Sequence, residues 1–511
     1  MPKTTYLSQT DTLMWMVEAD PLLRSTILGV VLLEAAPDWQ RLHHRIEEVT
    51  HQVPALREKV TPVPLHPTLL RWEPDPAFDL NYHLRRISLP PGSGVPELLD
   101  WARSTYAGGF DSSRPLWEFT LVEGVSHDGH PDGAAMILKA HHVVSDGIGS
   151  VQLAAHLFDF EEHPPQHEDT PRPPVARPNP MATMREVVAH DVEGLLEFSR
   201  KQMSTALPNL LHAVRHPQQA AKEFMETAVS VSKVVSPAMV PKSQVMVGRV
   251  KATNFRVLEV PVEALYRAAK TAGGKLNDGF VAGITAGLHL YHEHHGSDVH
   301  DLRVAMPISL REDAHAEGGN HITIMRFAVP VGSLTVEERI TSLRQVVDGV
   351  RHEKSIEHTG TIAGFLNLMP KGVIGAIMKG VDFLASNVPG VPTSMWLEGQ
   401  RVVRFFPFGP TAGSAVNVTL MSYNGTCCIG VNSDAAAIPD PDVLLDCLRA
   451  GFAEVCATVA LPAAKAPAKK KAPVKKAAAT AKKAAAPAKK APAKKVASTK
   501  KSPSARKTSG R

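Results

Sequence analysis

The 511-residue sequence has little cysteine, no long apolar segment and no acidic residue near its end. Its four cysteines show no metal-binding spacing, and so low a count in a long chain is typical of a reducing compartment. No run of 18 apolar residues occurs, which predicts that no segment spans a membrane. The first 20 residues contain a single lysine and no sustained apolar stretch, so we expect no secretory signal. These absences predict a cytoplasmic protein.

The charge of the sequence is divided between two regions of different character. Residues 461–511 hold 17 of the 56 basic residues and no acid, in repeats of Lys, Ala and Pro. The preceding residues therefore carry 39 basic against 51 acidic residues, a net charge of −12, which argues against nucleic-acid binding by this body. The tail has too little apolar surface to offset the entropy of ordering, so we expect it to be disordered. A polycation of this kind binds anionic lipid or nucleic acid, or stays solvated.

The length of the chain predicts more than one domain. Alternating strand and helix patterns, with a buried strand over 133–140, run to about residue 160 and resume near 246. Between them, a Pro-rich stretch at 163–180 is typical of a linker, and 183–240 follows a helical pattern. The sequence predicts an α/β fold with four parts: an N-terminal domain (1–162), a linker and helical connector (163–245), a C-terminal domain (246–460) and a tail (461–511).

The stretch KAHHVVSDGIGS, residues 139–150, places two adjacent histidines where a predicted strand ends and a helix begins. A neutral imidazole, with an ordinary pKa of about 6.5, accepts a hydroxyl proton at neutral pH, so His142 is a candidate general base. Asp146 can orient the ring, hold the loop through an arginine, or cap the following helix. On these residues alone, a pair of polar residues at a strand end is the simpler interpretation.

Other segments change that balance. HHVVSDG fits the HHxxxDG pattern of acyl-CoA-dependent acyltransferases, and on the segments that accompany it the sequence resembles the bacterial wax ester synthase/diacylglycerol acyltransferase family. Those segments follow in family order: LSQTDTLMW (7–15), FDLNYHLRRISLP (78–90), FDSSRPLWEFTLVEG (110–124), LNDGFVAGITAGL (276–288), RVAMPISLR (303–311), GGNHITIM (318–325) and SNVPG (386–390).

The resemblance implies two chloramphenicol acetyltransferase-like domains around a central tunnel, with the histidines at its centre. It implies that His142 takes the proton of an acceptor hydroxyl, which then attacks acyl-CoA, the co-substrate, without a metal or another cofactor. His141 would fix the loop. Asp146 would pair with Arg326 or Arg311. The acceptor would be diacylglycerol or a fatty alcohol.

The family also implies a set of substrate-binding residues beside the tunnel: Gly147, Pro115, Leu116, Trp117, Asn277, Asp278, Ser386 and Asn387. The glycine permits backbone conformations that other residues resist. The Pro-Leu-Trp segment either shapes a substrate channel or belongs to the core. The Asn-Asp pair precedes an apolar helix and is placed as an N-cap. The Ser-Asn pair precedes Pro and Gly in turn order, and offers hydrogen bonds to a substrate or an oxyanion.

Two further segments have alternative interpretations. The apolar stretch 361–386 either lies on a membrane surface or lines the tunnel. His292 and His295 are one helical turn apart, but no third ligand is evident, so we expect no metal there. With lipid substrates, we expect peripheral association with a membrane or lipid droplet. Two alternatives stay open: a non-catalytic lipid-binding or tethering protein with this fold, and an acyltransferase for another alcohol.

Overall fold

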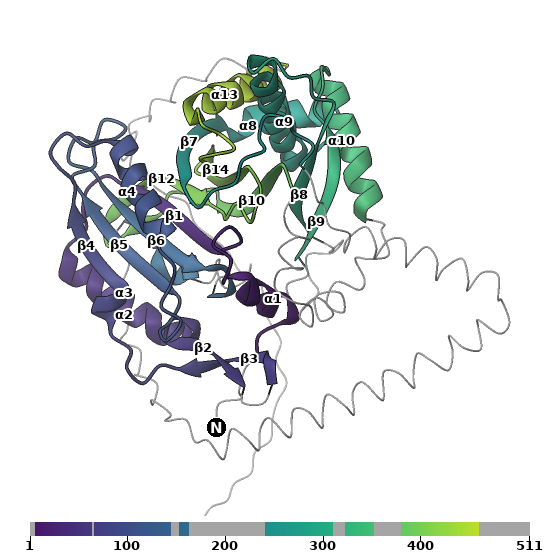
Figure 1. The fold of residues 1–511 in the computed structure, drawn as a ribbon. Coiled ribbons are helices and arrows are strands. Elements are labelled where there is room, and N and C mark those ends of the chain that lie inside the picture. The colour runs from purple at the N-terminus through teal and green to yellow at the C-terminus, as the bar shows by residue number, and fades with distance from the viewer. Residues whose placement is uncertain are drawn as a thin grey trace, which may run out of the picture. The chain divides into compact units, whose positions relative to one another are not determined.

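The computed structural model describes residues 6–63, 66–144, 153–162, 241–309, 322–351 and 380–458. Within them the expected α/β fold is confirmed, because two six-stranded mixed sheets are flanked by helices (Figure 1). The Pro-rich linker, the helical connector, the basic tail and most of the apolar stretch 361–386 lie outside the described residues.

The first sheet has the strand order β11-β12-β1-β6-β5-β4. Its central strands are apolar runs without polar alternation, as expected for strands that are buried on both faces. The strands are β1 (Thr26–Leu33), β4 (Leu84–Ser88), β5 (Trp117–Glu123), β6 (Ala134–His141), β11 (Trp396–Leu397) and β12 (Gln400–Phe408).

Helix α2 shows how the helices around this sheet are specified. Leu42, Ile46 and Val49 recur at helical spacing and are buried, while the side chain of Asp38 caps the first turn by accepting from the amide of Arg41 at 2.9 Å. The other elements of this half are α1 (Gln9–Val17), α2 (Trp39–Gln52), η1 (Pro54–Leu56), β2 (Glu58–Val63), β3 (His66–Pro74), α3 (Leu80–His83), α4 (Val95–Ala107) and η2 (His142–Val144).

The second sheet has the order β7-β14-β13-β10-β8-β9. Helices α8, α9 and α13 pack on one another, and α8 and α13 also pack on β7, whereas α10 packs on α9 and β9 (Figure 1). The elements are β7 (Thr253–Pro261), α8 (Val262–Thr271), α9 (Leu276–His294), β8 (Asp301–Ser309), β9 (Ile322–Pro330), α10 (Val336–Arg351), β10 (Phe383–Val391), β13 (Val416–Tyr423), β14 (Thr426–Asp434) and α13 (Pro441–Ala457).

Strands β11 and β12 come from the second half of the chain but belong to the first sheet. Strand β12 pairs antiparallel with β1, with Leu28 opposite Phe408 and Val31 opposite Phe405. Strand β1 is therefore enclosed between β12 and β6. The four predicted domain ranges stay predictions, and the structure adds that segment 396–408 is part of a sheet built mainly from residues before 162.

The SNVPG segment is in a strand, so the expectation of a turn was wrong. Ser386 and Asn387 lie in β10, which pairs in parallel with β13. The register of this pairing shifts between Val388 and Val391, so Pro389 and Gly390 fall where the ladder is interrupted. Proline, which lacks an N–H, is tolerated at such an irregularity, and this explains how the segment extends a strand.

Helices α9 and α13 approach each other through glycines. A Cβ atom on Gly283 would lie 2.3 Å from the ring of Phe452, and one on Gly287 would lie 2.7 Å from Cα of Leu448. Neither contact can exist without a shift of the helices. The absence of side chains at these positions therefore sets the distance between the two helices.

We expect Gly283→Ala to lower the free energy of unfolding by about 1–3 kcal/mol, because the added methyl group overpacks this contact. The matched control is Gly349→Ala in α10, where a Cβ atom meets nothing within 4 Å. That substitution is expected to stabilise the helix by about 0.5–1 kcal/mol. Urea unfolding of both variants checks the opposite signs. Equal midpoints would contradict the packing described here.

Candidate active site

The two adjacent histidines lie where β6 ends, as the sequence predicted. His141 is the last residue of the strand, and its amide donates to the carbonyl of Leu116 at 2.9 Å. His142 begins the short 3-10 helix η2, and its amide donates to the carbonyl of Ser25 at 2.8 Å. The backbone of the pair is thus held by the residues that precede the two neighbouring strands, β5 and β1.

The ring of His141 is buried, and both of its nitrogens form hydrogen bonds. Nδ1 accepts from the amide of Val143 at 3.2 Å, so the ring proton lies on Nε2, which donates to Oε2 of Glu18 at 3.1 Å. The edge-on rings of Trp15 and Phe110, with centroids 5.7 and 6.2 Å away, enclose it. His141 is therefore held in one tautomer and one orientation.

Glu18 follows the last residue of α1 and joins three segments through one carboxylate. Its Oε2 accepts from the amide of Ser25 at 2.9 Å as well as from His141. Its Oε1 lies 4.0 Å from Nε of Arg24. No pattern in the sequence points to this residue, since 123 positions separate it from His141 and a glutamate near a helix end is commonplace.

His142 differs from His141 in its environment. Its side chain is half-buried, whereas that of His141 is almost completely enclosed. Both nitrogens of His141 form hydrogen bonds within the protein, whereas part of the His142 side chain is exposed to solvent.

Asp146 and Gly147 lie outside the described residues, as does Arg311. The structure therefore does not place the expected ion pair of Asp146. Arg326, the other arginine expected for it, lies in β9, where burial, together with the like charge of Arg303, lowers the pKa of its guanidinium.

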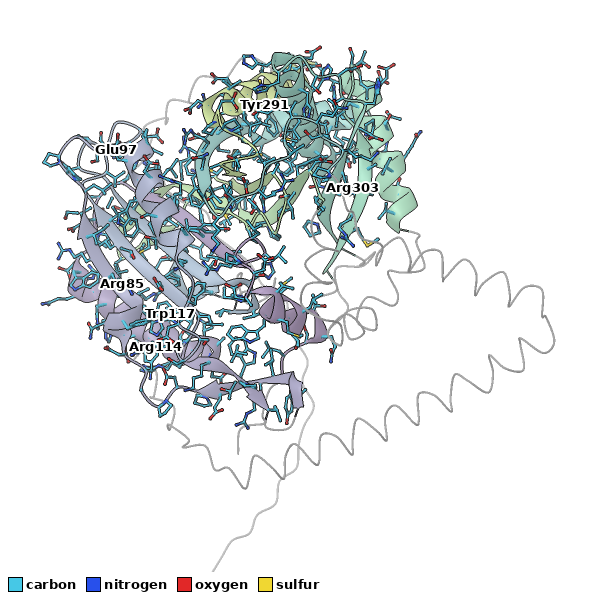
Figure 2. All side chains as sticks on the ribbon, in the orientation of Figure 1. Arg85, Glu97, Arg114, Trp117, Tyr291 and Arg303 are labelled. Atoms are coloured by element: carbon cyan, nitrogen blue, oxygen red, sulfur yellow. The ribbon has the colours of Figure 1, made fainter. Side chains whose placement is uncertain are left out.

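The Pro-Leu-Trp segment leads into β5 and holds the backbone of the motif through a hydrogen bond. Pro115 and Leu116 are buried, and Leu116 provides the carbonyl that holds the first histidine. Trp117, labelled in Figure 2, is completely buried. Its Nε1 donates to the carbonyl of Leu56 at 2.8 Å, and its ring stacks on that of His83 with centroids 4.7 Å apart. These contacts give the segment a place in the core, and its role in a substrate channel stays a prediction.

Asn277 and Asp278 lie two and three positions beyond the N-cap of α9, so the expectation that they form an N-cap pair was wrong. The N-cap is Lys275, and Asp278 is the third helical residue. The carboxylate of Asp278 accepts from the Lys275 amide at 2.7 Å, so it satisfies a first-turn donor from within the helix. Nδ2 of Asn277 lies 3.7 Å from the sulfur of Met306 in β8.

Ser386 and Asn387 lie in the middle of β10, the former half-buried and the latter exposed. Their neighbours in β13 are Thr419 and Leu420. Hydrogen bonding of these two residues to a substrate stays a prediction.

His292 and His295 each bind a partner of their own. His292 donates from Nδ1 to the carbonyl of Leu288 at 2.7 Å and accepts at Nε2 from the hydroxyl of Ser243 at 2.8 Å, while His295 lies 3.1 Å from Asp440. In the described part of the chain, no group of three or more His, Cys, Asp or Glu residues could hold a metal ion. No described helix is long and apolar enough to cross a membrane.

Two family models match the chain in succession. The wax ester synthase/diacylglycerol acyltransferase (WS/DGAT) catalytic domain matches residues 4–280, which include both histidines. The WS/DGAT C-terminal domain matches residues 318–455, which include β10.

Two mycobacterial proteins are similar to the chain over 90% of its length. One, from Mycobacterium tuberculosis strain H37Rv, has a name that provisionally assigns it diacylglycerol O-acyltransferase activity, and is 34% identical over 464 residues, or 90% of this chain and 93% of the relative. A second protein of that strain, with the same kind of name, is 25% identical over 488 residues, or 90% of this chain and 98% of the relative.

Solved structures share the fold. The wax ester synthase/diacylglycerol acyltransferase from Marinobacter aquaeolei VT8 matches with a TM-score of 0.58 at 17% identity, over 89% of this chain and 99% of that one. A variant of the starter condensation domain of rhizomide synthetase, solved with C8-CoA and Leu-SNAC, matches with a TM-score of 0.53 at 14% identity, over 89% and 94%. The fold that the sequence resemblance implied is thereby confirmed.

We expect Glu18→Ala to lower the free energy of unfolding by about 1–3 kcal/mol, because it leaves the buried donors of Ser25 and His141 unsatisfied. Glu18→Gln keeps an acceptor oxygen and should cost less. The control is Glu161→Ala, which removes an exposed carboxylate near the end of the described segment 153–162. Urea unfolding measures all three. Unchanged stability of Glu18→Ala would show that the carboxylate does not hold these segments together.

Proposed function

The chain belongs to the wax ester synthase/diacylglycerol acyltransferase family, and from this premise we propose that it transfers a long-chain acyl group from acyl-CoA to the hydroxyl of diacylglycerol or of a fatty alcohol. The names of the mycobacterial relatives favour diacylglycerol. The name of the Marinobacter protein includes both reactions, so a fatty alcohol is the second acceptor. The rhizomide synthetase domain binds C8-CoA on the same fold, which supports acyl-CoA as the donor.

One observation carries the assignment of His142 as general base. Both nitrogens of its neighbour, His141, are occupied by Val143 and Glu18, so His141 orients the motif and His142 is the ring that meets the acceptor. The neutral ring of His142 takes the hydroxyl proton as the acceptor oxygen bonds to the thioester carbonyl carbon. The tetrahedral intermediate then expels the CoA sulfur, which takes the proton from the imidazolium and leaves as the thiol. The acyl group passes directly to the alcohol, without an acyl-enzyme.

Glu18 acts in this scheme as a positioning residue. Its bond to His141 fixes the ring whose Nδ1 accepts from the amide of Val143, in the 3-10 turn that begins with His142. A change at Glu18 is therefore transmitted to the orientation of the base through two hydrogen bonds.

We expect His142→Ala to lower the rate of acyl transfer by about 10²–10⁴-fold, the usual contribution of a general base. The assay follows CoA thiol release from palmitoyl-CoA with diacylglycerol, and in parallel with hexadecanol, as acceptor. His300→Ala removes an imidazole whose side chain is 90% exposed, and serves as the control with unchanged rate. If His142→Ala retains the wild-type rate, the base is wrongly assigned. If the wild-type protein releases no CoA with any alcohol, the result supports the alternative of a non-catalytic lipid-binding protein.

Association with a membrane or lipid droplet surface is the second part of the proposal. Lipid substrates reside at such a surface, and a tail with 17 basic residues and no acid is attracted to anionic headgroups. We expect deletion of 461–511 to move the protein from the membrane fraction to the soluble fraction with little change in acyl transfer. A shift from the nucleoid to the soluble fraction would instead assign the tail to nucleic acid, and an unchanged distribution would leave it without either partner.

A further inference from the structure

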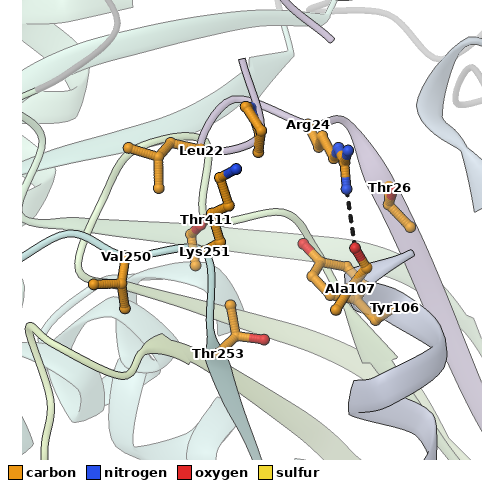
Figure 3. Close-up of a pocket in the computed structure, with 10 residues that line it drawn as sticks. Leu22, Arg24, Thr26, Tyr106, Ala107, Val250, Lys251, Thr253 and Thr411 are labelled. Carbon is orange, nitrogen blue, oxygen red and sulfur yellow. Dashed lines mark hydrogen bonds between the residues drawn. The ribbon is translucent and has the colours of Figure 1, made fainter. Parts of the chain in front are cut away.

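A small cavity lies beside the start of β1, the strand that pairs with the histidine-bearing strand β6 (Figure 3). Its volume is about 120 Å³, several times what a single water requires but far below the size of a whole cofactor pocket. Thr26 of β1 lines it and lies directly opposite His141 in the β1–β6 pairing. The residues that line it are Pro21, Leu22, Arg24, Thr26, Tyr106, Ala107, Val250, Lys251, Thr253 and Thr411.

The charged lining residues are both cations. Arg24 comes from the loop before β1 and Lys251 from the segment before β7 (Figure 3). The guanidinium of Arg24 donates from Nη1 to the carbonyl of Ala107 at 2.9 Å, which fixes its position, and the nearest carboxylate, on Glu18, is 4.0 Å away. Lys251 is exposed and forms no ion pair with the described residues. None of the described residues that line the cavity is acidic.

Two hydroxyl groups on the cavity wall have hydrogen-bonding capacity to spare. Oγ1 of Thr26 is buried, in a residue that is 1% exposed, and has no hydrogen-bond partner among the described residues. The hydroxyl of Tyr106 accepts from Nδ2 of Asn432 at 3.2 Å, which leaves its own proton to donate. Burial raises the pKa of Tyr106, so the hydroxyl keeps that proton. A buried polar group without a partner costs about 1–3 kcal/mol, which a ligand can recover.

The cavity thus offers a guanidinium, an ammonium and two hydroxyl donors, so a ligand that fits it must carry hydrogen-bond acceptors. We propose that it binds a phosphate group of the acyl-CoA donor. A phosphate has several charged acceptor oxygens, and arginine and lysine are the side chains that recognise it best. The inference rests on the proposed function, because diacylglycerol and fatty alcohols carry no charge and acyl-CoA is the substrate that does. The pantetheine arm separates these phosphates from the thioester, so one end of the donor is held at the cavity while the other reacts.

The test measures binding of CoA, dephospho-CoA, pantetheine and inorganic phosphate to the full chain by calorimetry. We expect Lys251→Glu to weaken CoA binding by about 10- to 100-fold, the usual worth of a charged hydrogen bond, and to leave pantetheine binding unchanged. Lys270→Glu makes the same charge change on α8, away from the cavity, and should leave CoA binding as it is. A difference between CoA and dephospho-CoA that disappears in Lys251→Glu identifies the 3′-phosphate; an equal loss for both identifies the diphosphate.

A second variant separates binding from folding. Thr26→Val replaces an unpartnered hydroxyl with a methyl group, so the protein without ligand should be as stable as the wild type or more stable, while CoA binding weakens. A merely structural threonine would not move these two quantities in opposite directions.

The outcomes against the inference are distinct from a failure of the proposed function. If the wild type transfers acyl groups but its CoA affinity is the same in all variants, the cavity does not hold the donor. If Lys251→Glu weakens only the binding of inorganic phosphate, the cavity binds free phosphate and the assignment to the acyl-CoA donor is overturned. If CoA binding depends on Lys251 but no acyl transfer occurs with any alcohol, the phosphate site stands and the proposed function fails.

Discussion

One partly buried carboxylate organises the residues around the two histidines. Glu18 accepts hydrogen bonds from the amide of Ser25 and the ring of His141, and so ties the end of α1 and the start of β1 to the end of β6. A carboxylate is suited to this because it has only acceptors, while each of its partners is a buried donor. The tautomer of His141 follows from it, and the arrangement of the turn that carries His142 follows from that tautomer.

Strand β1, which follows Ser25, pairs with a strand from the second half of the chain. Strand β1 has β6 on one edge and β12 on the other, and β12 comes from Gln400–Phe408. Without β12, the edge of β1 would present unpaired N–H and C=O groups. The second half of the chain is thus required for the sheet on which the first half holds the histidines, and the two described sheets belong to one compact unit.

The same neighbourhood separates its charges by function. Arg24 lies 4.0 Å from Glu18, which accepts a hydrogen bond from His141. Arg24 also lines a cavity whose charged lining residues are two cations, with no acidic residue among them. Arg24 comes from the first half of the chain and Lys251 from the second, so the cavity exists only when both halves are in place. The cavity adjoins β1 at Thr26, the residue that pairs with His141.

Local patterns in the sequence determined the elements and the identity of the motif. An apolar run predicted β6, and the paired histidines were placed at its end, because both patterns depend on residues within a few positions of one another. Only the tertiary structure decided the rest. The partner of His141 lies 123 positions away, β12 joins a sheet distant in sequence, and SNVPG extends a strand because a register shift accommodates its proline. These outcomes depend on the spatial order of the strands in the sheets, and no short stretch of sequence contains that order.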